Sequence, residues 1–219
     1  MKIRQLLLAL TLLVGCSAFA QWSVGVRDTR YVNVSYTFHK HWSAKLEHSV
    51  YSEKFQYQYV RLYMSYKHRI GRFLISGEPY FGMTYKNSYR SMGFNVDAEA
   101  RILNWLFAGA GFTPHYDSGM GYKSLYKAYI GFDCTKNIAI IGSFTNRPEY
   151  RMPEKRLRGG VRFTVGKLWV LPEISIPVED SEGSSVRFMG SMGFTFSLPV
   201  SRLEFDFAVA DDIEAGRKR

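Results

Sequence analysis

The sequence predicts an all-β fold, a transmembrane antiparallel up-and-down β-barrel of about 12 strands, within a range of about 10 to 14. Three observations lead to this class. Apolar and polar residues alternate along segment after segment, without a sustained helical period. The alternating segments are about 9 to 12 residues long, which suits a tilted strand that crosses a bilayer. Finally, the connections between segments alternate along the chain between tight turns and longer polar loops.

The N-terminus has the pattern of an export signal. Lys2 and Arg4 precede an apolar run over residues 6–14 that is too short to cross a bilayer as a helix. A small-x-small site ending at Ala20 predicts cleavage there, and the alternative is lipoprotein cleavage before Cys16. Either route exports the chain.

We therefore expect three regions along the chain. Residues 1–20 are the signal peptide and residues 21–210 the barrel. Residues 211–219 are either a polar tail or the start of a final strand that is missing from this sequence.

Charge and cysteine content narrow the function. The chain has 29 Lys and Arg against 19 Asp and Glu, a formal net charge of +10. An exported protein whose basic residues are spread along the chain is not expected to bind nucleic acid, so the excess suggests anionic lipid headgroups or a lumen that favours anions. Cys134 is the one thiol after export and makes no intramolecular disulfide.

The strand-like segments all follow the same rule. In residues 57–67, Val60, Leu62 and Met64 share one face while Tyr59, Arg61 and Tyr63 share the other. The remaining clear examples are residues 31–38, 42–51, 93–102 and 156–165. Alternation does not by itself say which face meets lipid, but a membrane barrel places the charged face in its lumen.

The connections separate the two ends of the predicted barrel. Tight turns are expected at residues 39–41, 70–71, 104, 135–137, 166–167 and near Pro199. Longer polar loops are expected around residues 53, 87–91, 117–121, 146–155 and 179–184. One end is therefore tight and the other has longer loops, as with periplasmic turns and outer loops.

Aromatic residues collect near both ends. Trp42, Trp105 and Trp169 each lie within two residues of a tight turn and predict one interface girdle. Tyrosines lie beside the longer loops, at positions 51, 57, 85, 89, 116, 122 and 150. His48 falls on an apolar face, so we expect it near an interface.

Prolines are the feature least suited to a closed barrel. Pro79 and Pro172 lie inside strand-like segments although proline cannot donate to a ladder. We expect β-bulges at both positions.

Together these features resemble bacterial outer-membrane β-barrel proteins of the small, porin-like kind, over residues 22–210. The FAQ at the signal boundary and the segment LEFDFAVADD resemble proteins of the Bacteroidota. The resemblance implies a Gram-negative outer membrane, contact with its lipids and lipopolysaccharide, and insertion by the barrel assembly machinery. The ending DDIEAGRKR departs from the terminal aromatic residue of such barrels.

The inward faces predict a charged lumen. Its expected lining is Arg61, Glu78, Asp97, Glu99, Arg101, Arg156, Arg158, Arg162, Glu173 and Arg187. In one interpretation these charges pair and fill a narrow barrel, which then has a structural or assembly role. In another, the arginines at positions 156, 158 and 162, with Arg61 and Arg187, select a small anionic solute in an open pore.

Two other functions stay open. A barrel enzyme that hydrolyses or transfers lipid acyl chains would use His115 and Ser118, although HYDS also reads as a turn and no catalytic residue is assigned. A soluble periplasmic barrel that binds an apolar ligand is the third possibility. Scattered histidines and the absence of a phosphate-binding glycine loop predict no metal and no cofactor.

Overall fold

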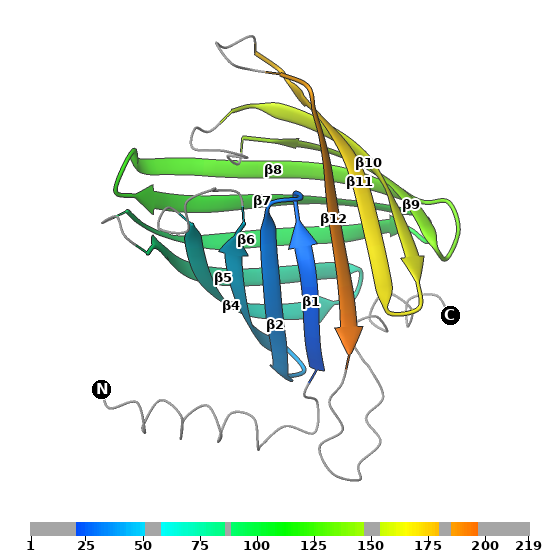
Figure 1. Ribbon diagram of the computed structural model, residues 1–219. Coiled ribbons are helices and arrows are strands. Elements are labelled where there is room, and N and C mark those ends of the chain that lie inside the picture. The colour runs from blue at the N-terminus through cyan, green and yellow to red at the C-terminus, as the bar shows by residue number, and fades with distance from the viewer. Residues whose placement is uncertain (1–20, 51–57, 86–88, 147–153, 180–184, 197–219) are drawn as a thin grey trace.

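Twelve antiparallel strands close into one barrel in the computed structural model (Figure 1), which confirms the predicted fold class. The structure describes residues 21–50, 58–85, 89–146, 154–179 and 185–196. The strands are β1 (Gln21–Arg27), β2 (Tyr31–His39), β3 (Trp42–Ser49), β4 (Tyr59–Ile70), β5 (Phe73–Thr84), β6 (Arg90–Leu103), β7 (Leu106–Asp117), β8 (Gly121–Asp133), β9 (Ile138–Thr145), β10 (Arg156–Val165), β11 (Leu168–Pro177) and β12 (Arg187–Phe196). Each strand pairs with its neighbours in sequence, and β1 pairs with β12 to close the barrel. Within these ranges no helix is long and apolar enough to cross a bilayer.

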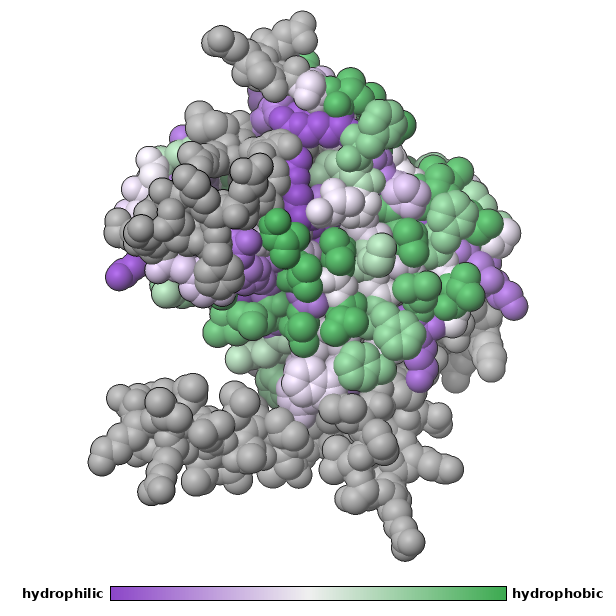
Figure 2. All heavy atoms as spheres, in the orientation of Figure 1, coloured by the Kyte–Doolittle hydropathy of each residue, from purple (hydrophilic) through white to green (hydrophobic). Residues whose placement is uncertain are grey.

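Alternation assigns the two faces of the wall as expected. On β4, Leu62 and Met64 are exposed on the outside, whereas Tyr63 and Ser65 are buried inside. Figure 2 shows a broad apolar area across the visible face of the barrel. So much contiguous apolar surface is unfavourable in water and favourable in a hydrocarbon environment.

The two ends of the barrel differ, although the predicted longer loop at residues 117–121 is short, with residues 118–120 between β7 and β8. The connections after β2, β4, β6, β8 and β10 are short and form one end, which we call the turn rim. The connections after β1, β3, β5, β7, β9 and β11 form the opposite end, the loop rim. The β1–β12 pairing places Trp22 opposite Phe196, where the start of β1 and the end of β12 lie side by side near the turn rim (Figure 1). The predicted turn near Pro199 and the segment LEFDFAVADD lie outside the described residues.

One loop-rim connection lies where the sequence predicted none. Residues 28–30 form a turn in which Asp28 and Thr29 have φ of 53° and 56°. The Thr29 N–H donates to the Gly190 carbonyl, so the turn is attached to β12. Left-handed backbone is costly for residues other than glycine, and these contacts offset that cost.

The prediction of β-bulges at Pro79 and Pro172 is wrong. The register is unchanged on either side of Pro79 and Pro172, and each simply lacks ladder pairs toward one neighbour, β4 or β10. Pro114, for which no bulge was predicted, lacks ladder pairs toward β6. The other neighbour stays paired, through Pro79 with Phe94, Pro172 with Gly190 and Pro114 with Ser124. A missing N–H affects one side of a strand only, so the ladder is interrupted without an added residue.

Glycines on the inner face accommodate aromatic rings. A Cβ on Gly131 would lie 2.1 Å from Cζ of Phe107, and one on Gly109 would lie 2.4 Å from Cζ of Tyr129. The same relation holds for Gly82 with Tyr59, Gly93 with Tyr80 and Gly193 with Trp169. These rings lie flat against the wall because no side chain stands beneath them.

This packing gives a stability test. We expect Gly131→Ala to lower the free energy of unfolding by about 1–3 kcal/mol, because the buried Phe107 ring must move. Urea unfolding in detergent, followed by tryptophan fluorescence, would measure it. Gly159→Ala is the control, since a Cβ there meets no atom within 4 Å. Equal losses in both variants would contradict the packing argument.

Candidate functional site: the charged lumen

The lumen contains a compact cluster around Glu47 of β3. Arg27 donates from Nε and Nη2 to the two carboxylate oxygens of Glu47, both at 2.9 Å. The Tyr63 hydroxyl donates to the same carboxylate at 3.0 Å, and the Arg61 guanidinium lies 4.0 Å away. Arg27 also contacts Asp28 at 2.7 Å. One carboxylate thus organises two arginines from different strands.

A row of arginines on β10 faces the same space. Arg158 lies 3.3 Å from Asp28, which belongs to the turn after β1, so this ion pair reaches across β11 and β12. Arg162 lies 3.9 Å from Asp133, whose other oxygen accepts from Arg101 at 2.8 Å. Both arginines are on the inner face, as the alternation of β10 predicts.

Arg156 begins this row but has a different role. It is fully buried, and it donates to the Ser175 hydroxyl at 2.8 Å, the Ser185 carbonyl at 2.7 Å and Glu154 at 2.7 Å. Its guanidinium therefore ties β10, β11 and the start of β12 together at the loop rim. Because it is not accessible to a solute, we leave Arg156 out of the proposed pore lining. Arg187 lies 3.8 Å from the same Glu154.

The acidic residues predicted for the lumen are concentrated on β5 and β6. Glu78 accepts from Ser65 and from Asn95, and Lys45 lies 3.5 Å away. Asp97 pairs with Lys127 at 3.0 Å, while Glu99 accepts from Tyr129 at 2.8 Å. Glu173 of β11 is on the inner face next to Gly160.

In the ion pairs of Arg27, Arg158 and Arg162 the base is more exposed than the acid. The order is reversed where Arg156 and Arg187 pair with Glu154. The Arg27 side chain is 41% exposed, whereas its partners Glu47 and Asp28 are 1% and 8% exposed. Arg162 is 26% exposed against 8% for Asp133. The carboxylates lie against the wall and the guanidinium groups cover them. In these three pairs the base is therefore the member more exposed to the lumen.

The aromatic residues near the turn rim agree in part with the predicted girdle. Trp42 and Trp105 are exposed on the outer face, with ring centroids 4.9 Å from Tyr66 and 6.0 Å from Phe132. Trp169 lies on the inner face, where its ring covers Gly193. We therefore do not include Trp169 in the girdle.

Two further aromatic contacts lie on the outer face. Trp22, which was not predicted for the girdle, contacts Tyr36 near the turn rim, with the two rings tilted and their centroids 4.7 Å apart. His48 lies beside Tyr85 near the loop rim, at 5.7 Å between ring centroids.

The pair considered for acyl-chain chemistry does not form a catalytic arrangement. The two ring nitrogens of His115 lie 2.6 Å from the Tyr80 hydroxyl and 3.4 Å from the Asp117 carboxylate. Ser118 accepts from the Arg90 N–H, and Asp117 accepts from the N–H groups of residues 119 and 120. These contacts are those of a structured turn, with no Ser–His contact, so the geometry gives no support to the enzyme.

The histidines at the turn rim approach one another. The rings of His39 and His68 lie 5.9 and 4.9 Å from that of His41, whose Nδ1 is 2.9 Å from the Lys67 carbonyl oxygen. No group of three or more His, Cys, Asp or Glu able to hold a metal is found among the residues that the structure describes.

A closed antiparallel barrel with an apolar exterior and a charged interior has the architecture of the bacterial outer-membrane porins. Two solved structures of the KdgM porin share the fold at 10% and 13% sequence identity, with TM-scores of 0.58 and 0.53. Each comparison covers 82% of this chain and 98% of the porin, and the first porin is in complex with disordered oligogalacturonate. A third structure, from work on in-meso crystallisation of membrane proteins, has 8% identity and a TM-score of 0.54, over 88% of this chain and 89% of that one. No protein-family model and no curated protein matches the chain.

Proposed function

We propose that the protein is a porin-like channel of the bacterial outer membrane that favours anionic solutes. The observation that carries the proposal is the placement of exposed guanidinium groups over buried carboxylates in the lumen. A solute on the barrel axis meets the cations first, and their partners are shielded behind them. Rings of basic side chains select anions in other pores by the same electrostatics.

The outer-membrane location rests on several features. The exterior is apolar, Trp42 and Trp105 lie near one rim, and the fold is shared with porins. The short turns then face the periplasm and the loop rim faces outward. This location makes outer-membrane lipids, lipopolysaccharide and the barrel assembly machinery the partners. The Bacteroidota origin rests on the sequence segments named above and is part of the proposal.

Acidic oligosaccharides are the solute class we propose. The structural relative in complex with oligogalacturonate binds a chain with repeated carboxylates. Here Arg158 and Arg162 are four residues apart on one strand face, about 13 Å along β10. A polyanion in the lumen can contact both at once, whereas a small inorganic anion contacts one.

The proposal is tested by conductance in a planar bilayer, after migration on an unboiled gel has shown a folded barrel. We expect Arg158→Ala with Arg162→Ala to reduce the ratio of anion to cation permeability by about fivefold per charge, since a unit charge contributes about 1 kcal/mol at 4 Å in water. The double substitution leaves neither partner carboxylate unpaired, because Asp28 still pairs with Arg27 and Asp133 still pairs with Arg101.

Lys40→Ala is the matched control. It removes one positive charge from the exposed turn after β2, so its effect is compared with the change per charge in the double variant. Unchanged selectivity in the Arg158/Arg162 variant would contradict the anion channel. No conductance from folded wild-type protein would favour the filled, structural barrel.

A further inference from the structure

We propose that the outer wall of β6, β7 and β8 carries a binding groove for one acyl chain of a phosphorylated lipid, with Arg90 binding the phosphate. The inference rests on the proposed function in one respect, that the loop rim lies in the outer leaflet. It does not require that the barrel conducts.

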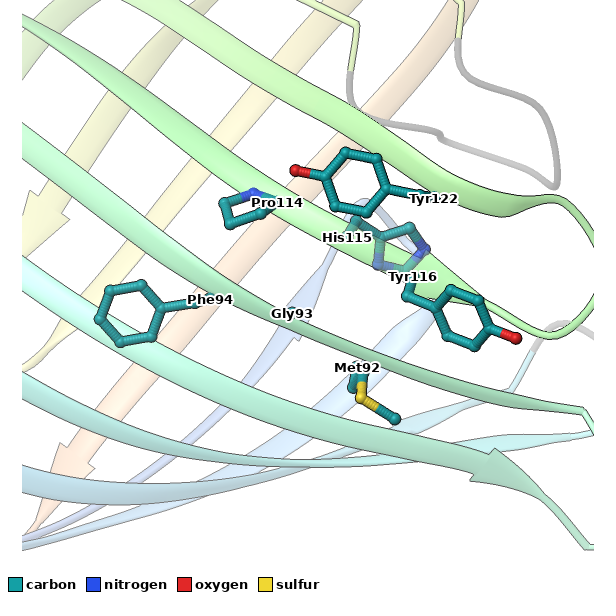
Figure 3. A pocket seen from close by; sticks show the side chains of 7 residues that line it. All are labelled: Met92, Gly93, Phe94, Pro114, His115, Tyr116 and Tyr122. Carbon is teal, nitrogen blue, oxygen red and sulfur yellow. The ribbon is translucent and has the colours of Figure 1, made fainter.

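The groove lies on the lipid-facing side near the loop rim. Its lining comes from Met92, Gly93 and Phe94 of β6, Pro114, His115 and Tyr116 of β7, and Tyr122 of β8, and its volume is about 310 Å³ (Figure 3). Ligand sites begin at about 300 Å³, so the space suits one chain rather than a large partner. The outward side chains that line it are apolar or aromatic.

Pro114 explains why a hollow forms here. Between the pairs Gly93↔His115 and Val96↔Phe112, β6 and β7 have no ladder pairs, because Pro114 has no N–H to donate. On its other side, β6 pairs continuously with β5. The groove thus coincides with an interruption of the wall.

Polarity along the groove matches the orientation of a lipid. Arg90, Met92 and Phe94 alternate onto the outer face of β6, starting at the loop rim and moving into the membrane. Arg90 is exposed about 7 Å from Met92, and its guanidinium has no ion pair among the residues described. Its backbone N–H donates to Ser118, which fixes the main chain.

An amphiphile with a phosphate at Arg90 therefore places its chain over Met92 and Phe94. Guanidinium binds phosphate through two parallel hydrogen bonds, which a neutral headgroup cannot accept with the same strength. Tyr116 and Tyr122 are exposed at the rim end of the groove, where an amphipathic ring suits the interface.

Native mass spectrometry of the folded full-length barrel in detergent tests the site. The probes are dipalmitoyl phosphatidic acid, dipalmitoylglycerol and inorganic phosphate. We expect one phosphatidic acid per barrel, binding at least tenfold tighter than dipalmitoylglycerol, and no retained inorganic phosphate. Arg90→Ala is expected to weaken phosphatidic acid binding about tenfold, with partial recovery in Arg90→Lys.

Two further variants test the groove itself and control for the loss of an arginine. Met92→Trp fills the groove and is expected to weaken phosphatidic acid binding, while Arg72→Ala, an exposed arginine at the turn rim, leaves it unchanged. Equal binding of the two lipids, or no effect of Arg90→Ala on folded protein, would overturn the proposal. Conductance of the same wild-type preparation tests the channel separately. Failure of phosphatidic acid binding would therefore not count against the channel, and absence of conductance would not count against the lipid site.

Discussion

Replacement of Arg156 by alanine is expected to lower the free energy of unfolding by about 3–5 kcal/mol, the cost of breaking a buried ion pair. The side chain is fully buried and donates to Ser175, Ser185 and Glu154. Alanine leaves Glu154 with the more distant Arg187 at 3.8 Å, and it leaves the Ser185 carbonyl without this donor. The loss falls on the loop-rim ends of β10 to β12.

Urea unfolding in lipid vesicles measures the effect, and limited proteolysis should show faster cleavage at the loop rim. Arg162→Ala is the matched control, because it is the same substitution on the same strand face. Its contact with Asp133 is loose and that carboxylate keeps Arg101, so we expect a loss within about 1 kcal/mol. Equal losses at the two positions would show that Arg156 does not connect these strands.

Glu47→Ala is expected to act on both stability and selectivity. It removes hydrogen bonds from Arg27 and Tyr63, each worth about 1.5–3 kcal/mol where one partner is charged. Asp28 and water restore part of this, and we expect a net loss of about 3 kcal/mol. The permeability ratio should move about fivefold toward anions, since one negative charge is lost near Arg27 and Arg61.

The direction of the selectivity change is the informative part. It is opposite to that of Arg158→Ala with Arg162→Ala, although both variants break ion pairs. Glu47→Gln, which keeps the shape, should show most of the selectivity change with a smaller loss of stability. Glu179→Gln, an exposed carboxylate paired with Lys155 at the loop rim, is the control. A shift toward cations in Glu47→Gln would show that the carboxylate does not offset the arginines.

Much of the fold was predictable because a strand has a period of two. Once Leu62 is known to face out, Arg61 and Tyr63 must face in, and the ladder passes that choice to both neighbours. The turn rim was predictable for a related reason, since the alternation is interrupted at each turn. Pro79 and Pro172 were misread because the pattern does not reveal that a proline N–H position can simply stay unpaired.

The site was less predictable because pairing depends on neighbours far apart in sequence. Three arginines share one face of β10, at positions 156, 158 and 162, and look equivalent in the sequence. Only Arg156 of these is fully buried, and it donates to Ser185 and Glu154. Arg27 was missed because its strand is short and its partner Glu47 lies on β3, two strands away from β1. A possible signal was Asp28-Thr29-Arg30, polar turn formers directly after an alternating segment.

The pairing of β1 with β12 has a consequence for biogenesis. It joins Trp22 to Phe196 and Val26 to Met192, the contacts of greatest sequence separation in the wall. Contacts this distant form late, because the intervening chain must first be organised. Until β12 arrives, the remaining sheet has two unpaired edges that can recruit strands from other chains. Each chain must therefore be kept apart from its copies until β12 has paired with β1.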